Sequence, residues 1–311
     1  MLVDTIQCWF ADDAASGGNL KCLRDWWGLL TKKGPQFGYY PNAVKTFLLV
    51  KPEKYNEAAN VFQDTGVEIT CTGRRYLGGT LGTRAFEIEA MKAKVTQWVL
   101  EIRDLSKVAE TQPHAAYAAF THALIGRWTY SMRVFAMSAD EVLKPLEEAI
   151  AQYLIPALTK QPAPATVSRD LLALPARLGG LGIVKPITWG KCQQETSAMA
   201  CKPLTELILK QEGDVSNATL KQRKIKKRLQ QLRRDELRRE AENTITALPL
   251  LQQKCARLAQ EKGCSSWLVA IPIQRLGFTL HKGAFQDALC LRYGCMGFKA
   301  GTLKMSLWGG L

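Results

Sequence analysis

The chain has 311 residues, with 42 Lys and Arg against 28 Asp and Glu, and a formal net charge of +14. Hydrophobic residues make up 47% and charged residues 23%, which excludes a chain that is disordered throughout and an acidic solvating protein. No apolar run reaches the roughly 18 to 20 residues that cross a bilayer, and the first residues carry acid where a secretory signal carries base. We expect an intracellular protein of cytoplasm or nucleus without a membrane partner.

The first eighty residues predict alternating strands and helices. An apolar strand from Leu2 to Phe10 leads into a turn with two carboxylates, then into the small residues Ser16 to Gly18. The next elements are a helix over Asn19 to Lys33 that Gly34-Pro35 ends, a strand over Thr46 to Val50, a short helix over Glu53 to Asp64 and a strand over Val67 to Cys71.

From Thr83 onward the pattern takes a helical period. One long helix is predicted to about Glu110, a second starts at Pro113, and a capping box at Ser138 to Glu141 opens a third. The inward positions of the third helix are Leu143, Leu146, Ile150, Leu154 and Leu158. Residues 160–166 contain two prolines and form the best linker candidate, and a turn-rich packing segment follows over Leu178 to Ile183. Ser216 to about Lys262 then reads as a long helix interrupted near Pro249.

Adjacent carboxylates stand at the predicted hairpin turn Phe10-Ala11-Asp12-Asp13. Such oxygen ligands suit Mg²⁺, and two such ions activate a hydroxyl and stabilise a departing pyrophosphate. An Asp-Asp pair by itself is typical of a solvated turn, because Asp favours turns for backbone reasons. The segments that follow it change this interpretation.

Asn42-Ala-Val-Lys45-Thr46 follows the carboxylate turn, and Tyr76-Leu77-Gly78 comes after that. In this order and spacing, residues 1 to about 85 resemble the reverse transcriptases of mobile elements that lack long terminal repeats. A weaker resemblance, to the thumb of these enzymes, extends through the helices to about residue 185. The resemblance implies an α+β, mostly helical fold. It implies a partial polymerase palm of short antiparallel strands with helices (1–82), a helical thumb-like module (83–160) and a basic helical C-terminal region (161–311).

By this resemblance, Asp12 would ligate catalytic Mg²⁺, Asp13 would support the site, and Lys45 would lie near the phosphates of the incoming nucleotide. The turn that holds the primer end would be Gly73, Arg74, Arg75, Tyr76, Leu77 and Gly78. A further palm aspartate and the fingers precede the Asp-Asp turn in this family, and only eleven residues precede Asp12 here. We therefore expect an N-terminally truncated enzyme, inactive alone, whose partners are an RNA or DNA primer-template and a complementary polymerase fragment.

A strongly basic run extends over 221–240, with ten Lys and Arg against three acidic residues. Ile225, Leu229, Leu232 and Leu237 give it a narrow apolar seam, so it reads as an amphipathic helix that binds a phosphate backbone. Its cations are Lys221, Arg223, Lys224, Lys226, Lys227, Arg228, Arg233, Arg234, Arg238 and Arg239. A solvated helix, a coiled-coil partner and a nuclear import signal are the alternatives.

Nothing in the sequence predicts zinc. The nine cysteines are odd in number and never spaced C-x-x-C, so we expect mostly buried free thiols. His114 and His122 lack cysteine partners at ligand spacing, and residues 295–311 bring no zinc ligand set. Aromatic residues that neighbour basic residues, such as Trp98, Trp128 and Tyr130, have the helical spacing of core residues, and stacking of nucleic-acid bases on them is the alternative.

Three functions therefore stay open. The first is a fragment related to Mg²⁺-dependent, template-directed DNA synthesis on RNA. The second is a nucleic-acid-binding protein without catalysis, which uses the thumb and the basic helix. The third is a helical adaptor whose basic run contacts an acidic partner.

Overall fold

The computed structural model of the protein describes residues 5–135, 140–160 and 167–294. Helices account for 70% of the described residues, and three small two-stranded sheets lie in the N-terminal part. The fold is therefore α+β and mostly helical, as the sequence predicts.

The chain forms two compact units that interleave along the sequence. The first unit combines Met1–Val95, Thr129–Val142 and Gly190–Leu232, and the second combines Thr96–Trp128, Leu143–Trp189 and Arg233–Leu311. The predicted domains 1–82, 83–160 and 161–311 are consecutive instead, and this division stays a prediction.

The carboxylate turn closes a β-hairpin. Strand β1 (Thr5–Phe10) pairs antiparallel with β2 (Asp13–Gly18), and Phe10 lies opposite Asp13. The loop therefore has two residues, Ala11 and Asp12, and Ala11 has a φ of 52°. The small residues Ser16 to Gly18 continue β2, because the tight loop places them opposite β1, where they extend the ladder.

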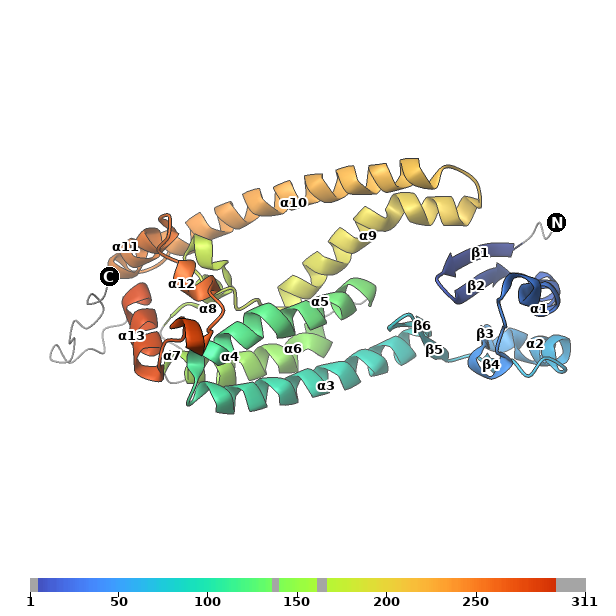
Figure 1. Ribbon diagram of the computed structural model, residues 1–311, viewed down its shortest axis with the longest axis horizontal. Coiled ribbons are helices and arrows are strands. Elements are labelled where there is room, and N and C mark those ends of the chain that lie inside the picture. The colour runs from blue at the N-terminus through green and yellow to red at the C-terminus, as the bar shows by residue number, and fades with distance from the viewer. Residues whose placement is uncertain (1–4, 136–139, 161–166, 295–311) are drawn as a thin grey trace. The chain divides into compact units, whose positions relative to one another are not determined.

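A helix–strand layer follows the hairpin in the first unit (Figure 1). Helix α1 (Leu20–Lys33) begins after Asn19, whose side chain accepts a hydrogen bond from the Cys22 amide at 2.9 Å, and it ends at Gly34 as predicted. Strand β3 (Phe47–Leu49), helix α2 (Tyr55–Phe62) and strand β4 (Glu68–Thr70) then form a β-α-β arrangement. Its core residues are Trp27, Leu48, Ala58, Phe62 and Val67.

The β3 and β4 strands run parallel. The expectation of antiparallel strands is therefore wrong for this pair. Helix α2 connects the two strands, and a crossover helix returns the chain to the same end of the sheet, which makes the next strand parallel.

A second hairpin joins β5 (Gly73–Tyr76) to β6 (Gly79–Gly82). Its two loop residues, Leu77 and Gly78, have φ values of 47° and 76°, as in the tight turns whose twist matches that of the strands. The loop packs on helix α5 (Ile125–Val134), where the Tyr130 hydroxyl donates a hydrogen bond to the Leu77 carbonyl.

The helices predicted after Thr83 form with π-helical turns inserted. The elements are α3 (Arg84–Ala109), α4 (Pro113–Ala119), a π-turn at Phe120–Leu124, α5, α6 (Asp140–Ala149), a π-turn at Ile150–Leu154 and α7 (Ile155–Thr159). All five inward positions predicted from Leu143 to Leu158 are 1% exposed or less. Ser138 and Ala139 of the predicted capping box lie outside the described residues.

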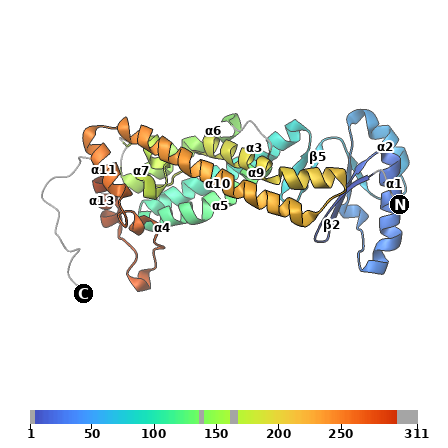
Figure 2. The ribbon, with the colours of Figure 1, turned by 90° about the horizontal axis from the view of Figure 1, so that it is seen from above.

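The remaining helices include the long α10 (Figures 1 and 2). They are α8 (Arg169–Ala173), α9 (Pro186–Lys210), α10 (Val215–Thr246), α11 (Leu250–Gln260), α12 (Ser266–Val269) and α13 (Lys282–Tyr293). Short 3₁₀ turns cover Gly34–Phe37, Ala43–Lys45, Pro52–Lys54, Ala176–Leu178 and Gln274–Leu276. The predicted break near Pro249 is confirmed. Most of the predicted linker and all of the segment 295–311 lie outside the described residues.

The glycine-rich segment at Leu178 to Ile183 packs tightly in the second unit. The Tyr117 hydroxyl donates to the Leu181 carbonyl at 2.7 Å, and a Cβ on Gly180 would lie 2.0 Å from the carbonyl oxygen of Leu174. No real Cβ tolerates such a distance, so glycine is required at position 180.

We therefore expect Gly180→Ala to lower the free energy of unfolding by about 2 kcal/mol or more, because the backbone must move to admit the methyl group. The matched variant is Gly126→Ala on α5, where nothing lies within 4 Å of the new Cβ. It should raise stability by about 0.5 to 1 kcal/mol, since alanine favours the helix. Urea denaturation followed by circular dichroism measures both, and equal midpoints for Gly180→Ala and the parent would contradict this packing.

Candidate functional site

The two aspartates of the turn are exposed at the tip of the β1–β2 hairpin. Asp12 is the second loop residue and Asp13 is the first residue of β2. Within the described part of the chain, no Lys, Arg or His lies within 4 Å of either carboxylate. Both therefore keep free oxygen atoms that face solvent.

Two tyrosines lie near these carboxylates. Burial raises the pKa of Tyr39, and the negative charges of Asp13 and Asp12 raise it further. Burial also raises the pKa of Tyr76, followed by the charge of Asp13 and the Cys8 thiol. The structure thus brings Tyr76, from the predicted primer-holding turn, into electrostatic range of Asp13.

Tyr39 is a member of this site that the sequence analysis missed. Its ring meets that of Trp9 edge to face, with centroids 5.4 Å apart. It lies in a loop after α1, and no spacing rule links a loop tyrosine to a hairpin thirty residues earlier. Only the tertiary contact with β1 reveals it.

The carboxylate turn offers two oxygen ligand groups to a metal ion. Among residues 5–135, 140–160 and 167–294, no three His, Cys, Asp or Glu side chains gather as a group able to hold a metal ion. Mg²⁺ often binds through one or two carboxylates and takes its other ligands from water and substrate phosphates. Asp12 and Asp13 fit that limited role.

Lys45 is exposed and is not brought to the carboxylates by any ion pair in the described structure. Its segment has a clear local role instead. The Asn42 side chain accepts hydrogen bonds from the Val44 and Lys45 amides at 3.0 and 3.3 Å, which holds the short turn before β3. The Asn-x-x-Lys-Thr pattern therefore shapes this turn.

The predicted primer-holding turn is the β5–β6 hairpin. Arg74 forms an ion pair with Glu68, whereas Arg75 is exposed. Gly73 is buried with a φ of 152°, and a Cβ there would lie 2.5 Å from the Phe86 ring. Glycine is thus required where this hairpin meets the start of α3.

The basic run lies on α10, the longest helix described. No residue between Ala218 and Ala241 is buried. Ile225, Leu229 and Leu237 are half-buried, as the predicted seam requires. Leu232 lies on the same face by helical rotation, but it is 55% exposed.

Most cations of the basic run on α10 have no acidic partner among the described residues. Arg233 pairs with Glu236 and Glu240, at 2.6 and 3.2 Å, and Arg238 pairs with Asp235 at 3.3 Å. Of the ten, the other eight have no carboxylate within 4 Å in the described structure, and all eight are exposed. They are Lys221, Arg223, Lys224, Lys226, Lys227, Arg228, Arg234 and Arg239.

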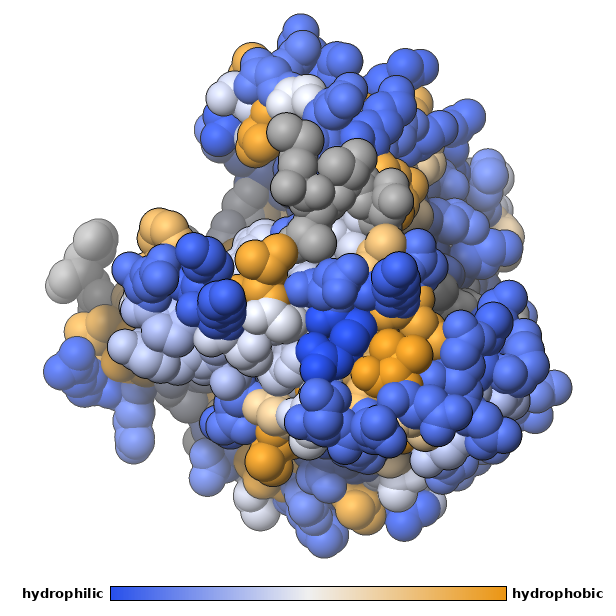
Figure 3. All heavy atoms as spheres, turned by 90° about the vertical axis from the view of Figure 1, so that its right-hand side faces the viewer, coloured by the Kyte–Doolittle hydropathy of each residue, from blue (hydrophilic) through white to orange (hydrophobic). Residues whose placement is uncertain are grey.

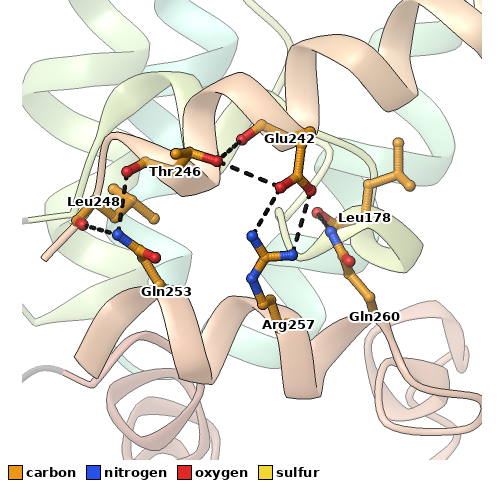
Figure 4. Close-up of polar contacts among 7 residues, drawn as sticks. All are labelled: Leu178, Glu242, Thr246, Leu248, Gln253, Arg257 and Gln260. Atoms are coloured by element: carbon orange, nitrogen blue, oxygen red, sulfur yellow. Dashed lines mark hydrogen bonds and ion pairs between the residues drawn. The ribbon is translucent and has the colours of Figure 1, made fainter. Parts of the chain in front are cut away.

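A polar cluster anchors the carboxyl end of α10 to α11 (Figure 4). Both guanidinium nitrogens of Arg257 donate to the Glu242 carboxylate, at 2.8 and 3.3 Å, and this hydrogen-bonded pairing lowers the pKa of Glu242. Gln253 donates to the carbonyls of Thr246 and Leu248 across the break, at 3.1 and 2.8 Å.

The aromatic residues predicted to lie in the core are buried, apart from Tyr130. Trp98 and Trp128 are buried with ring centroids 5.8 Å apart, whereas Tyr130 is half exposed and bonded to the hairpin loop. His114 is also buried, stacks on Phe285 and accepts a hydrogen bond from the Leu280 amide at 3.1 Å, which is a packing role.

The eight described cysteines form no disulfide with one another, and the expectation that most are buried is wrong, since six are half-buried and Cys201 and Cys264 are exposed. Cys295 lies outside the described residues.

Hydrophilic side chains cover most of the face shown in Figure 3, with smaller apolar groups between them. Across the described residues, none of the helices is both long and apolar enough to span a lipid bilayer.

Comparisons with models of protein families, with curated proteins and with solved structures found no match for this chain.

Replacing Asp12 and Asp13 by Asn should lower the pKa values of Tyr39 and Tyr76 toward the ordinary value of about 10. A nearby negative charge disfavours tyrosinate, so removing it favours deprotonation, while the contribution of burial remains. NMR titration of protein with ¹³C-labelled tyrosine rings measures the change. The control is Asp25→Asn, which changes an exposed residue of α1. Unchanged pKa values of both tyrosines in the double variant would contradict an electrostatic effect of the two carboxylates on them.

Proposed function

We propose that this protein binds the phosphate backbone of nucleic acid through α10. The observation that supports the proposal most is the set of eight exposed cations without a carboxylate partner in the described structure. A solvated helix of ordinary kind offsets its cations with acids at i,i+3 and i,i+4, as Arg233 and Arg238 do. The segment Lys221 to Arg228 has no acid at all.

The dimensions of the helix suit this function. The run 221–240 is about 30 Å long at 1.5 Å per residue. Duplex DNA carries one phosphate charge per about 1.7 Å of its axis, so phosphates are available along the whole run. Displaced counterions would supply much of the binding free energy, and affinity would fall steeply with salt.

A second candidate function is that of a reverse-transcriptase-like fragment. It is supported by the charge of Asp13, which raises the pKa of Tyr76 in the second hairpin, and by the order of these segments, which is the one that the resemblance implies. Asp12 would hold Mg²⁺, Asp13 would support it, and a bound Mg²⁺ would stabilise the leaving pyrophosphate. Among the described residues, no third His, Cys, Asp or Glu joins this pair to form a metal-holding group, so completion by another chain is part of the proposal. Lys45 stays a candidate for nucleotide contact.

The backbone-binding proposal predicts a specific loss. A variant with all six cations from Lys221 to Arg228 changed to Gln should reduce the slope of log affinity against log salt by about 5. Fluorescence anisotropy with a labelled duplex between 50 and 200 mM salt measures this slope. The control is Lys32→Gln, Lys33→Gln, which removes exposed charges from α1. If the parent binds an acidic peptide but no nucleic acid, α10 belongs to an adaptor.

The polymerase proposal predicts complementation. With Mg²⁺ and a primed RNA template, the chain alone should extend no primer, whereas a mixture with a separately expressed fingers and upper-palm fragment should. Asp12→Ala, Asp13→Ala should abolish that extension, since the pair holds the metal. Primer extension by the double variant in the mixture would show that Asp12 and Asp13 do not hold the catalytic metal. If the mixture with the parent chain extends no primer, the polymerase proposal is wrong and the binding function is favoured.

A further inference from the structure

The six cations from Lys221 to Arg228 surround much of the helix axis. Successive residues in an α-helix are rotated by about 100°, which places these six over an arc of about 220°. The remaining arc contains Gln222 and Ile225, which are half-buried, and the buried Ala218. The helix therefore turns one narrow side toward the rest of its own unit and a wide basic surface outward.

The cations of this basic surface fall into three groups around the helix axis: two on opposite sides and one between them. Arg223 and Lys226 lie on one side of α10, and Lys221 and Arg228 lie on the opposite side, about 180° away by the same rotation. Lys224 and Lys227 lie between them. All six side chains are exposed and lack a carboxylate partner in the described structure.

A partner that uses all six cations must surround the helix. A flat anionic surface or a single extended strand meets one side and leaves the opposite cations in solvent. The major groove of A-form RNA is deep and too narrow for side chains to read. The major groove of B-form DNA is about 12 Å wide, with a phosphate wall on each side, and a helix with its side chains is about 10 to 12 Å across.

We infer that the segment Lys221 to Arg228 lies in the major groove of duplex DNA. Arg223 and Lys226 would contact the phosphates of one strand, Lys221 and Arg228 those of the other, and Lys224 and Lys227 would face the groove floor. Over about 12 Å of helix, a duplex presents about seven phosphate charges, comparable to these six cations. The inference rests on the proposed binding function and names its substrate class and geometry.

Paired variants test the two-sided contact. Arg223→Gln, Lys226→Gln and Lys221→Gln, Arg228→Gln each remove two charges, from opposite sides, and glutamine keeps the helix propensity. Lys32→Gln, Lys33→Gln is the matched control. The full chain is titrated by fluorescence anisotropy against a 20-base-pair DNA duplex, an RNA duplex of the same sequence and the single DNA strand, with circular dichroism to verify folding.

The parent should bind the DNA duplex about tenfold more tightly than either other probe at the same salt. Each double variant should lower the slope of log affinity against log salt by about 2, and the control should leave it unchanged. Loss in one double variant alone, or equal affinity for all three probes, would overturn the groove inference but keep backbone binding. Absence of binding to every probe at low salt would overturn the proposed function itself.

Discussion

Like-charge repulsion within α10 is the constraint on which this interpretation of the molecule depends. Arg223 and Lys227, and Lys224 and Arg228, stand four residues apart on the same helix face, and such pairs destabilise a helix by a few tenths of a kcal/mol each. The helix forms nevertheless, because Lys, Arg, Gln and Leu are good helix formers and because its end is held by Glu242 and Arg257. A polyanion would relieve the repulsion that remains.

In the N-terminal region, tight turns determine where the strand residues lie. The two-residue loops at Ala11-Asp12 and Leu77-Gly78 fix the register of their hairpins, and one places a pair of carboxylates where the chain reverses. Tyr76 then lies in electrostatic range of Asp13, and Tyr130 holds the second loop to α5.

Local patterns predicted most elements because they depend on neighbouring residues. Gly34-Pro35 ended α1, Pro249 ended α10, and the spacing of Leu143, Leu146 and Ile150 predicted their burial. The failures involved pairing and coverage. The strand over Ser16 to Gly18 forms through its partner β1, and Leu232 is 55% exposed although it lies on the apolar face of its helix.

The sequence by itself determined the charge, the helical periodicity, the positions of the turns and the adjacency of Asp12 and Asp13, since these are properties of the chain. Only the tertiary structure decided that β3 and β4 run parallel, that Tyr39 joins the carboxylate turn, and that eight cations of α10 have no carboxylate partner among the described residues. The physical reason is the same in each case. Pairing, burial and charge compensation depend on which distant segment arrives next to a residue, and that is a property of the folded chain.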